Sequence, residues 1–235
     1  MKLSVIIPFY NEQDNVAKLI SATTEQLKGV DYELILVDDG SNDNTVKNAM
    51  SMLTSSIQLL VLDQNYGQSI ALKAGLDSSK GELIAFMDGD LQNNPSDILK
   101  MLVFLETSDA VMIQGYRKFR QDTFSKKISS ILANLIIRVL FNTKLHDVGC
   151  SIKIFRRELI SNIQFFKGFH RFLPLITAIN GFKVEETEVH HSARESGKSK
   201  YGISRVFSVL NHLIKLRFRR QLLAESLTYK IKEKH

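Results

Sequence analysis

The first 114 residues alternate short apolar runs with longer segments of helical periodicity, and this alternation limits the possible folds more than any other feature of the sequence. Apolar runs predict strands at Leu3–Phe9, Glu33–Val37, Ile57–Leu62, Glu82–Met87 and Ala110–Gln114. Caps and periodicity predict four helices between these strands. The first runs from Glu12, with Asn11 as its cap, to about Leu27, and the second runs from caps at Ser41 and Asp43 to about Leu53. The third runs from Gly67 to about Leu76, and the fourth from Pro95 to about Glu106. Strands that alternate with such helices indicate an α/β fold, with a mostly parallel sheet and helices on both faces.

The pattern changes after Arg117. Ser125–Phe141 and Gly202–Leu223 each place apolar residues on one side and basic residues beside them, which predicts two amphipathic helices. The rest predicts a strand at Ile152–Phe155, a helix at Phe169–Asn180, a strand at Lys183–Val189 and a polar loop at Arg194–Gly202. We expect one domain over residues 1–223, with halves at 1–114 and 115–223, and a polar tail over 224–235 that is frayed from Glu225 to His235.

Charge is divided unevenly along the chain. Residues 1–114 carry 7 Lys and Arg against 16 Asp and Glu, a net charge of −9, whereas residues 115–235 carry 24 against 9, a net charge of +15. A basic half suggests a polyanionic partner or an anionic membrane, although a solvated basic surface is the commoner explanation of such charge runs. The single cysteine, Cys150, excludes an intramolecular disulfide. The longest apolar stretch, Ile131–Phe141, is shorter than the roughly 20 residues of a membrane span, and the N-terminus begins as a strand rather than as a signal peptide.

Acidic residues follow the predicted parallel strands at the edge where such sheets bind ligands. Asp88-Gly89-Asp90 comes directly after Leu83–Met87, and two carboxylates separated by one residue can turn towards one ion. Mg²⁺ binds through one or two carboxylates together with substrate phosphates. Asp38–Ser41 also follows a strand, but turn and cap chemistry explains that segment as well as ligand binding does.

Four motifs in this order resemble those of family 2 glycosyltransferases: Val5–Glu12, Val37–Ser41, Asn65–Gln68 with Ala71 and Gly75, and Asp88–Gln92. Three further features resemble the polyprenyl-phosphate and dolichyl-phosphate glycosyltransferases of that family: Pro95 after Asp90-Leu91-Gln92, then Gly115-Tyr116-Arg117, then Gly197–Tyr201. The resemblance covers about residues 3–205. It implies the GT-A fold and a metal-dependent, inverting hexosyltransferase that moves a sugar from a UDP- or GDP-sugar to undecaprenyl or dolichyl phosphate, with residues 1–114 binding the donor and 115–223 the acceptor.

The same resemblance implies a role for individual residues. Those that would hold the nucleoside are Pro8, Tyr10, Glu12 and Asp39. Those that would hold Mg²⁺ or Mn²⁺ beside the nucleotide are Asp88, Asp90 and Gln92. Those that would meet the acceptor phosphate are Arg117 and Arg120. Those that would close over the pyrophosphate are Arg194, Ser199 and Lys200. Asp147 lies where the family often has an acidic residue at the reaction centre. Without the resemblance, a structural role as a turn residue before Gly149 would explain this aspartate equally well.

The charge around the acceptor residues separates two kinds of acceptor. A sugar hydroxyl loses a proton as it attacks and needs a general base, whereas a phosphate monoester, with a second pKa of about 6, is already anionic. Residues 115–145 contain seven Lys and Arg against Asp122 alone, and this balance favours a phosphate. The enzymatic alternative is transfer to a glycan hydroxyl in cell-surface polysaccharide synthesis, with Asp147 as the base.

The two basic amphipathic helices predict peripheral attachment to an anionic membrane surface on the cytoplasmic, inner face. Many relatives continue into two membrane-spanning helices after the Ser199-Lys200-Tyr201 loop, so we expect this chain to resemble span-free members and to use a membrane-protein partner or a homo-oligomer. A nucleic-acid-binding module is the non-enzymatic alternative. It lacks a recognisable recognition helix or RNA-binding aromatic motif, and the acidic rim opposes it, so we expect no nucleic-acid partner.

Overall fold

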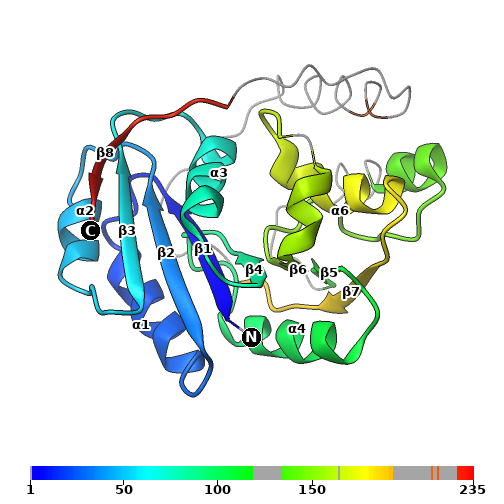
Figure 1. The fold of residues 1–235 in the computed structure, drawn as a ribbon, viewed down its shortest axis with the longest axis horizontal. Coiled ribbons are helices and arrows are strands. Elements are labelled where there is room, and N and C mark those ends of the chain that lie inside the picture. Colours follow the sequence, from blue (N-terminus) through cyan, green and yellow to red (C-terminus); the bar gives the residue numbers. More distant parts are fainter. Residues whose placement is uncertain (1, 119–133, 164, 193–212, 214–215, 217–226) are drawn as a thin grey trace.

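The structure is a computed structural model of the 235-residue chain, and it describes residues 2–118, 134–163, 165–192, 213, 216 and 227–235. One eight-stranded sheet runs through them in the order β7-β5-β6-β4-β1-β2-β3-β8 (Figure 1). The strands are β1 (Leu3–Phe9), β2 (Tyr32–Asp38), β3 (Ile57–Leu62), β4 (Leu83–Phe86), β5 (Met112–Tyr116), β6 (Lys153–Arg156), β7 (Val184–Glu188) and β8 (Ile231–Lys234). Parallel pairing joins β4 to β1, β1 to β2, β2 to β3 and β5 to β7. The predicted mostly parallel α/β sheet is therefore confirmed.

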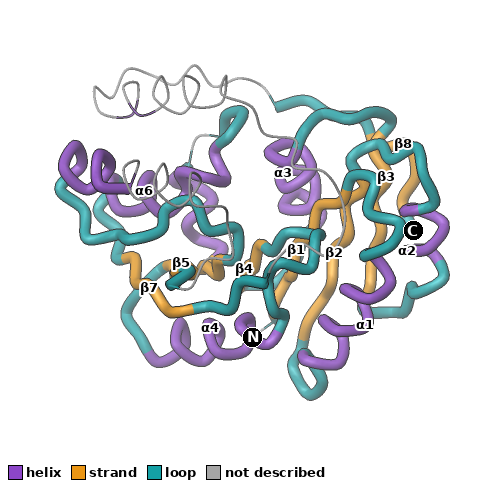
Figure 2. The backbone as a smooth tube through the Cα atoms, turned by 180° about the vertical axis from the view of Figure 1, so that it is seen from behind, coloured by secondary structure: helices purple, strands orange, loops and turns teal. Residues whose placement is uncertain are grey.

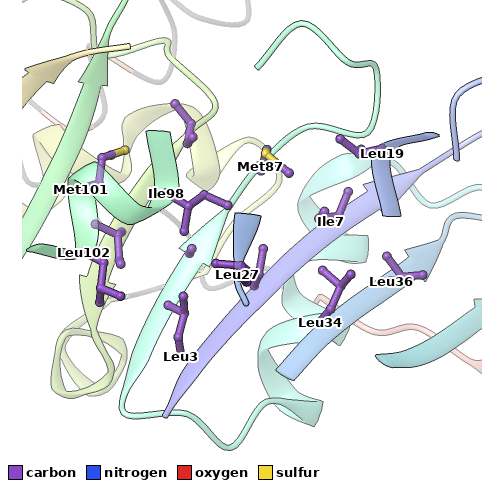
Figure 3. Close-up of a cluster of buried hydrophobic side chains, with 14 of the residues drawn as sticks. Leu3, Ile7, Leu19, Leu27, Leu34, Leu36, Met87, Ile98, Met101 and Leu102 are labelled. Carbon is purple, nitrogen blue, oxygen red and sulfur yellow. The ribbon is translucent and has the colours of Figure 1, made fainter. Parts of the chain in front are cut away.

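Helices cover both faces of this sheet (Figures 1 and 2). They are α1 (Val16–Gln26), α2 (Thr45–Met50), α3 (Gln68–Ser78), α4 (Ser96–Thr107) and α6 (Phe169–Ile179), and residues 134–141 are also helical. Successive strand residues face opposite sides, so Ile7 and Leu34 pack under α1 and α4 (Figure 3), whereas Ile6 and Ile35 pack under α3 and α6. Both faces of the central strands are buried, which explains their continuous apolar sequences.

The first helix begins at Val16, so the predicted start at Glu12 with Asn11 as its cap is wrong. The segment before it is tied to the loop after β2 and to the first residue of α2, because the Asn11 N–H donates to Ser41 Oγ (2.8 Å) and the Glu12 N–H donates to Thr45 Oγ1 (2.8 Å). Asn11 also has a φ of 55°. Residues 11 and 12 are thus held by hydrogen bonds to distant residues and do not form the first helical turn that the sequence pattern predicted. The predicted caps of α2 at Ser41 and Asp43 are also wrong, because the N-cap is Asn44 and makes no side-chain cap hydrogen bond. Asp43 Oδ1 accepts the Thr45 N–H (2.9 Å) from just before the helix.

The prediction of a frayed C-terminal tail is wrong for residues 231–234, which form β8 along the outer edge of β3 (Figure 1). The strands pair antiparallel, and Leu59 and His235 exchange backbone hydrogen bonds of 2.8 and 2.9 Å. Leu227, Tyr229 and Ile231 pack partly buried against the core on the α3 side. The alternating sequence Tyr-Lys-Ile-Lys thus places one apolar face on the core and one charged face in solvent.

Deleting residues 227–235 should lower the free energy of unfolding by about 3 kcal/mol, because three partly buried side chains and the β8 ladder are lost. Urea unfolding measures this value. Tyr229→Phe is the control, since it removes only the hydrogen bond from the Tyr229 hydroxyl to Asp77 (2.8 Å) and should cost less than about 1 kcal/mol. A deletion variant as stable as the full chain would mean that β8 adds nothing.

Part of the predicted basic half lies outside the described residues. This applies to Arg120, to residues 125–133 of the first amphipathic helix, to the loop with Arg194, Ser199 and Lys200, and to most of the helix predicted at Gly202–Leu223. None of the helices in the described ranges combines the length and the apolar character needed to cross a bilayer.

Candidate active site

The strand directions bring four polar segments to one rim of the sheet. β1, β2 and β4 are parallel, so their carboxyl ends share an edge. β6 lies between β4 and β5 and is antiparallel to both, pairing Lys153 with Phe86 on one side and with Gln114 on the other. The carboxyl end of β5 therefore lies at the same edge. Tyr10–Glu12, Asp39, Asp88–Asp90 and Arg117 all follow these strand ends.

Asp39 organises the part of the rim predicted to hold the nucleoside. Its carboxylate is buried and accepts the backbone N–H groups of Tyr66 and Gly67, both at 2.8 Å. Gly67, with a φ of 95°, precedes α3 in a conformation that favours glycine. Asp39 thus fixes the loop between β3 and α3. Pro8 is buried in β1, Tyr10 is half-buried, and Glu12 accepts a hydrogen bond from Asn15 Nδ2 (2.7 Å).

Asp88 and Asp90 flank a turn that only glycine allows. A Cβ on Gly89 would lie 2.6 Å from the Phe9 ring and 2.7 Å from the Pro8 carbonyl oxygen, so the turn packs directly on the end of β1. Asp88 Oδ1 accepts a 2.6 Å hydrogen bond from Gln68 Nε2 at the start of α3. Asp90 is buried and Oδ1 accepts the Gln92 N–H (3.2 Å). The Gln92 side chain donates to the Ser192 carbonyl (3.2 Å), beyond the end of β7.

The electrostatics of this pair favour a cation. Burial and then the negative charge of Asp90 raise the pKa of Asp88 to about 6, although Ser151, Lys153 and Arg117 act in the opposite direction. Within the described residues, no group of three or more His, Cys, Asp or Glu side chains is placed to hold a metal ion. Among the described residues, Asp88 and Asp90 are the two carboxylates that follow β4, and substrate phosphate and water would complete a coordination shell. This donor set fits Mg²⁺ or Mn²⁺ bound together with a nucleotide.

Arg117 and Asp147 form a buried ion pair at the end of β5. Nε and Nη2 of Arg117 donate to Oδ2 and Oδ1 of Asp147 at 2.7 and 2.9 Å, and the side chains are 12% and 4% exposed. Two further contacts hold the aspartate, because its N–H donates to Glu186 Oε1 (3.0 Å) and its carbonyl accepts from Gln114 Nε2 (3.2 Å). The ion pair thus fixes the position of the Arg117 guanidinium at the end of β5, and a guanidinium is a group that binds phosphate.

A hollow of about 460 Å³ opens beside this pair, between β7 and the segment 143–146. Tyr116, Lys144, His146 and Glu186 are among its lining residues. The carboxylate of Glu186 accepts hydrogen bonds from the backbone N–H of His146 (2.8 and 2.9 Å to its two oxygens) and from Nδ1 of the His146 ring (2.8 Å). The hollow is thus open space next to the residues predicted to meet the acceptor.

Three residues beside Asp88 had no role in the sequence prediction. They are Gln68, Ser151 and Lys153. Gln68 belongs to the motif Asn65–Gln68, which was a signal for its place on the rim. Ser151 and Lys153 had no such signal, because only the antiparallel insertion of β6 between β4 and β5 brings them to Asp88.

Comparison with known proteins gives consistent relatives. The sequence model described as "Glycosyl transferase family 2" matches residues 4–164. A dodecaprenyl-phosphate galacturonate synthase from Rhizobium johnstonii is 40% identical over 93% of this chain and 67% of its own length. An undecaprenyl-phosphate 4-deoxy-4-formamido-L-arabinose transferase from Enterobacter sp. is 36% identical over 91% of this chain and 66% of its own length. The chain thus spans about two thirds of the length of these relatives.

Solved structures share the fold at low sequence identity. Glucosyl-3-phosphoglycerate synthase from Mycobacterium tuberculosis in complex with uridine diphosphate has a TM-score of 0.69 at 18% identity, covering 93% of this chain and 79% of that one. The same enzyme with Mn²⁺, uridine diphosphate and glucosyl-3-phosphoglycerate has a TM-score of 0.71 at 16% identity, covering 92% and 79%. At this identity the likeness establishes the fold alone.

Proposed function

Because the chain belongs to glycosyl transferase family 2 and has the GT-A fold, we propose that it transfers a sugar from a nucleotide-diphosphate sugar to a polyprenyl phosphate. The observation that carries this proposal is that Asp88 and Asp90 follow β4 while Arg117 follows β5, and only β6 lies between these two strands in the sheet. A site for a metal-bound diphosphate would then lie beside the guanidinium of Arg117, which would bind the phosphate of the acceptor. The relatives named for dodecaprenyl and undecaprenyl phosphate support the same acceptor class.

The residues divide the work of an inverting, in-line displacement. Asp39 and the loops it ties bind the nucleoside, and Asp88 and Asp90, with Gln92, hold Mg²⁺ or Mn²⁺. A bound divalent cation supplies charge stabilisation for the departing nucleoside diphosphate. Arg117 orients the acceptor phosphate, whose oxygen forms the new bond to the anomeric carbon as the bond to the diphosphate breaks. Arg120, Arg194, Ser199 and Lys200 retain the roles implied by the family.

Incubation with a radiolabelled UDP- or GDP-sugar, polyprenyl phosphate and Mn²⁺ tests this function. Label should enter the organic-extractable lipid, and the matching nucleotide sugar with Mn²⁺ should raise the melting temperature, since a ligand of the folded state stabilises it. Label found only in water-soluble glycans would contradict the lipid acceptor. No stabilisation by any nucleotide sugar would contradict the donor site.

Asp147 distinguishes the lipid acceptor from a glycan hydroxyl. Asp147→Asn should retain at least about a tenth of the wild-type kcat, because a phosphate acceptor needs no general base and the amide oxygen still accepts from Arg117. Initial rates at saturating donor measure this. Asp109→Asn, at an exposed aspartate paired with Lys183, is the control. A loss of a hundredfold or more in kcat, in a variant that still folds, would favour base catalysis and the glycan alternative.

Membrane attachment at the cytoplasmic face is part of the same proposal. Helical residues 134–141 expose Leu135, Val139 and Leu140, with Arg138 among them. Val139→Glu should weaken binding to vesicles containing anionic lipid several-fold in a flotation assay, because it places a charge on the apolar stripe. Val103→Glu is a matched control, since Val103 is 59% exposed on α4 at the other face of the sheet, against 74% for Val139. Equal loss in both variants would contradict attachment through residues 134–141.

A further inference from the structure

Lys153 is a charged side chain in the interior for which the proposed function has no role. It begins β6, between β4 and β5, and is 1% exposed. Its Nζ donates a 2.8 Å hydrogen bond to the carbonyl oxygen of His170, in the first turn of α6. Within the described part of the chain this is its one hydrogen-bond acceptor, although an ammonium carries three donors. Burying an ion costs several kcal/mol unless an opposite charge compensates it.

The compensating charge is on the rim. The strand register places Lys153 opposite Phe86, and Phe86 stands two residues before Asp88 in the chain. The side chains of Lys153 and Phe86 lie on the α3 and α6 side of the sheet. Asp88 and Asp147 act on Lys153 as opposite charges, and Arg117 acts as a like charge. His170 adds no charge of its own, because burial and the nearby Arg171 and Lys153 keep its pKa well below the usual range.

The surrounding hydrogen bonds fix this arrangement. His170 Nδ1 lies 3.1 Å from Ser69 Oγ, which also accepts the Gly168 N–H (2.7 Å). Ser69 follows Gln68, whose amide holds Asp88. The first turns of α3 and α6 are thus joined around Lys153 and Asp88. A neutral donor would make the same bond to the His170 carbonyl without burying a charge, so a tether between β6 and α6 does not account for the ammonium.

We propose that Lys153 is a positioning residue that acts as an internal counter-charge to Asp88 and lowers the affinity of the empty site for a divalent cation. The cation then binds together with the donor diphosphate, whose own negative charge offsets the repulsion from Lys153. Charges at buried positions interact through a low effective dielectric, so an ammonium beside the carboxylate of Asp88 has a large effect on a cation bound there. This inference rests on the proposed function.

Two substitutions separate the charge from the hydrogen bond. Lys153→Gln keeps a donor for the His170 carbonyl and removes the charge, whereas Lys153→Arg keeps the charge. Binding of Mn²⁺ alone, followed by the electron paramagnetic resonance signal of the free ion, should be about tenfold tighter in Lys153→Gln than in wild type and unchanged in Lys153→Arg. With uridine diphosphate present, the difference between Lys153→Gln and wild type should shrink.

Melting temperatures of the same variants expose a purely structural role. If Lys153→Gln melts lower while binding Mn²⁺ as weakly as wild type, Lys153 is only a tether and the inference is overturned. If Lys153→Gln does not fold, the wild-type protein provides the test. In wild type, Mn²⁺ should bind at least about tenfold more tightly with uridine diphosphate than without it. Equal affinities would overturn the inference while leaving the proposed function standing. Wild type that binds no Mn²⁺ even with uridine diphosphate would contradict both.

Discussion

Replacing Asp90 with alanine should reduce sugar transfer to polyprenyl phosphate by roughly a thousandfold or more, equivalent to at least about 4 kcal/mol of transition-state stabilisation. The pair at the end of β4 provides the two carboxylates of the candidate metal site, and within the described residues no larger acidic or histidine cluster can replace them. Without Asp90, the proposed site would lose one of the two carboxylates that would hold the cation, and with it the charge stabilisation of the departing diphosphate. Label in the organic-extractable fraction measures the loss.

The loss should not come from unfolding. Asp88 and Asp90 repel each other, since the charge of Asp90 raises the pKa of Asp88, so the ligand-free Asp90→Ala protein should melt no lower than wild type. Mn²⁺ should also no longer add to the stabilisation given by uridine diphosphate. Asp31→Ala, at an exposed aspartate just before β2 and at the opposite edge of the sheet, should leave activity unchanged. An Asp90→Ala enzyme with a tenth of wild-type activity would contradict the metal site.

Arg117→Ala should have two large effects, one on stability and one on transfer. Its removal leaves the carboxylate of Asp147 buried without its guanidinium partner, which should lower the free energy of unfolding by about 3 kcal/mol or more. Transfer should fall at least a hundredfold, with a raised KM for polyprenyl phosphate and an unchanged KM for the donor. Urea unfolding and initial rates at varied acceptor concentration measure the two effects.

The double variant Arg117→Ala/Asp147→Ala separates them. It should recover much of the lost stability, because no unpaired carboxylate remains, and should recover no activity. Lys118→Ala is the control at the next residue. The Lys118–Glu188 pair has side chains that are 50% and 54% exposed, so its loss should change stability by less than about 1 kcal/mol. An Arg117→Ala enzyme with wild-type KM for the acceptor would remove Arg117 from the acceptor site.

The sequence predicted the parts of this molecule that depend on local pattern. β1 to β5 follow apolar runs, and the acidic residues that follow β1, β2 and β4 meet on one rim because parallel strands end at the same edge. The resemblance to family 2 glycosyltransferases is also confirmed. The roles given to individual residues of the site stay predictions.

What the sequence did not predict depends on contacts between distant segments. The direction of β6 between β4 and β5 is set by pairing partners far apart in the chain, so its short apolar pattern carried no sign of Lys153 beside Asp88. The late start of α1 arises from hydrogen bonds to Ser41 and Thr45, about thirty residues away. The polar residues of β8 pointed to a frayed tail, because the partner that makes them a strand is β3.

The pairing of β3 with β8 has a consequence for how the protein is made. A ribosome releases β3 long before residues 231–234 emerge, so during synthesis the outer edge of β3 presents unpaired backbone groups to the surroundings. Open strand edges are templates for intermolecular association. A nascent chain in which β1 to β3 have already formed should therefore engage holding chaperones until β8 emerges, and slower translation of the segment between β3 and β8 should increase aggregation.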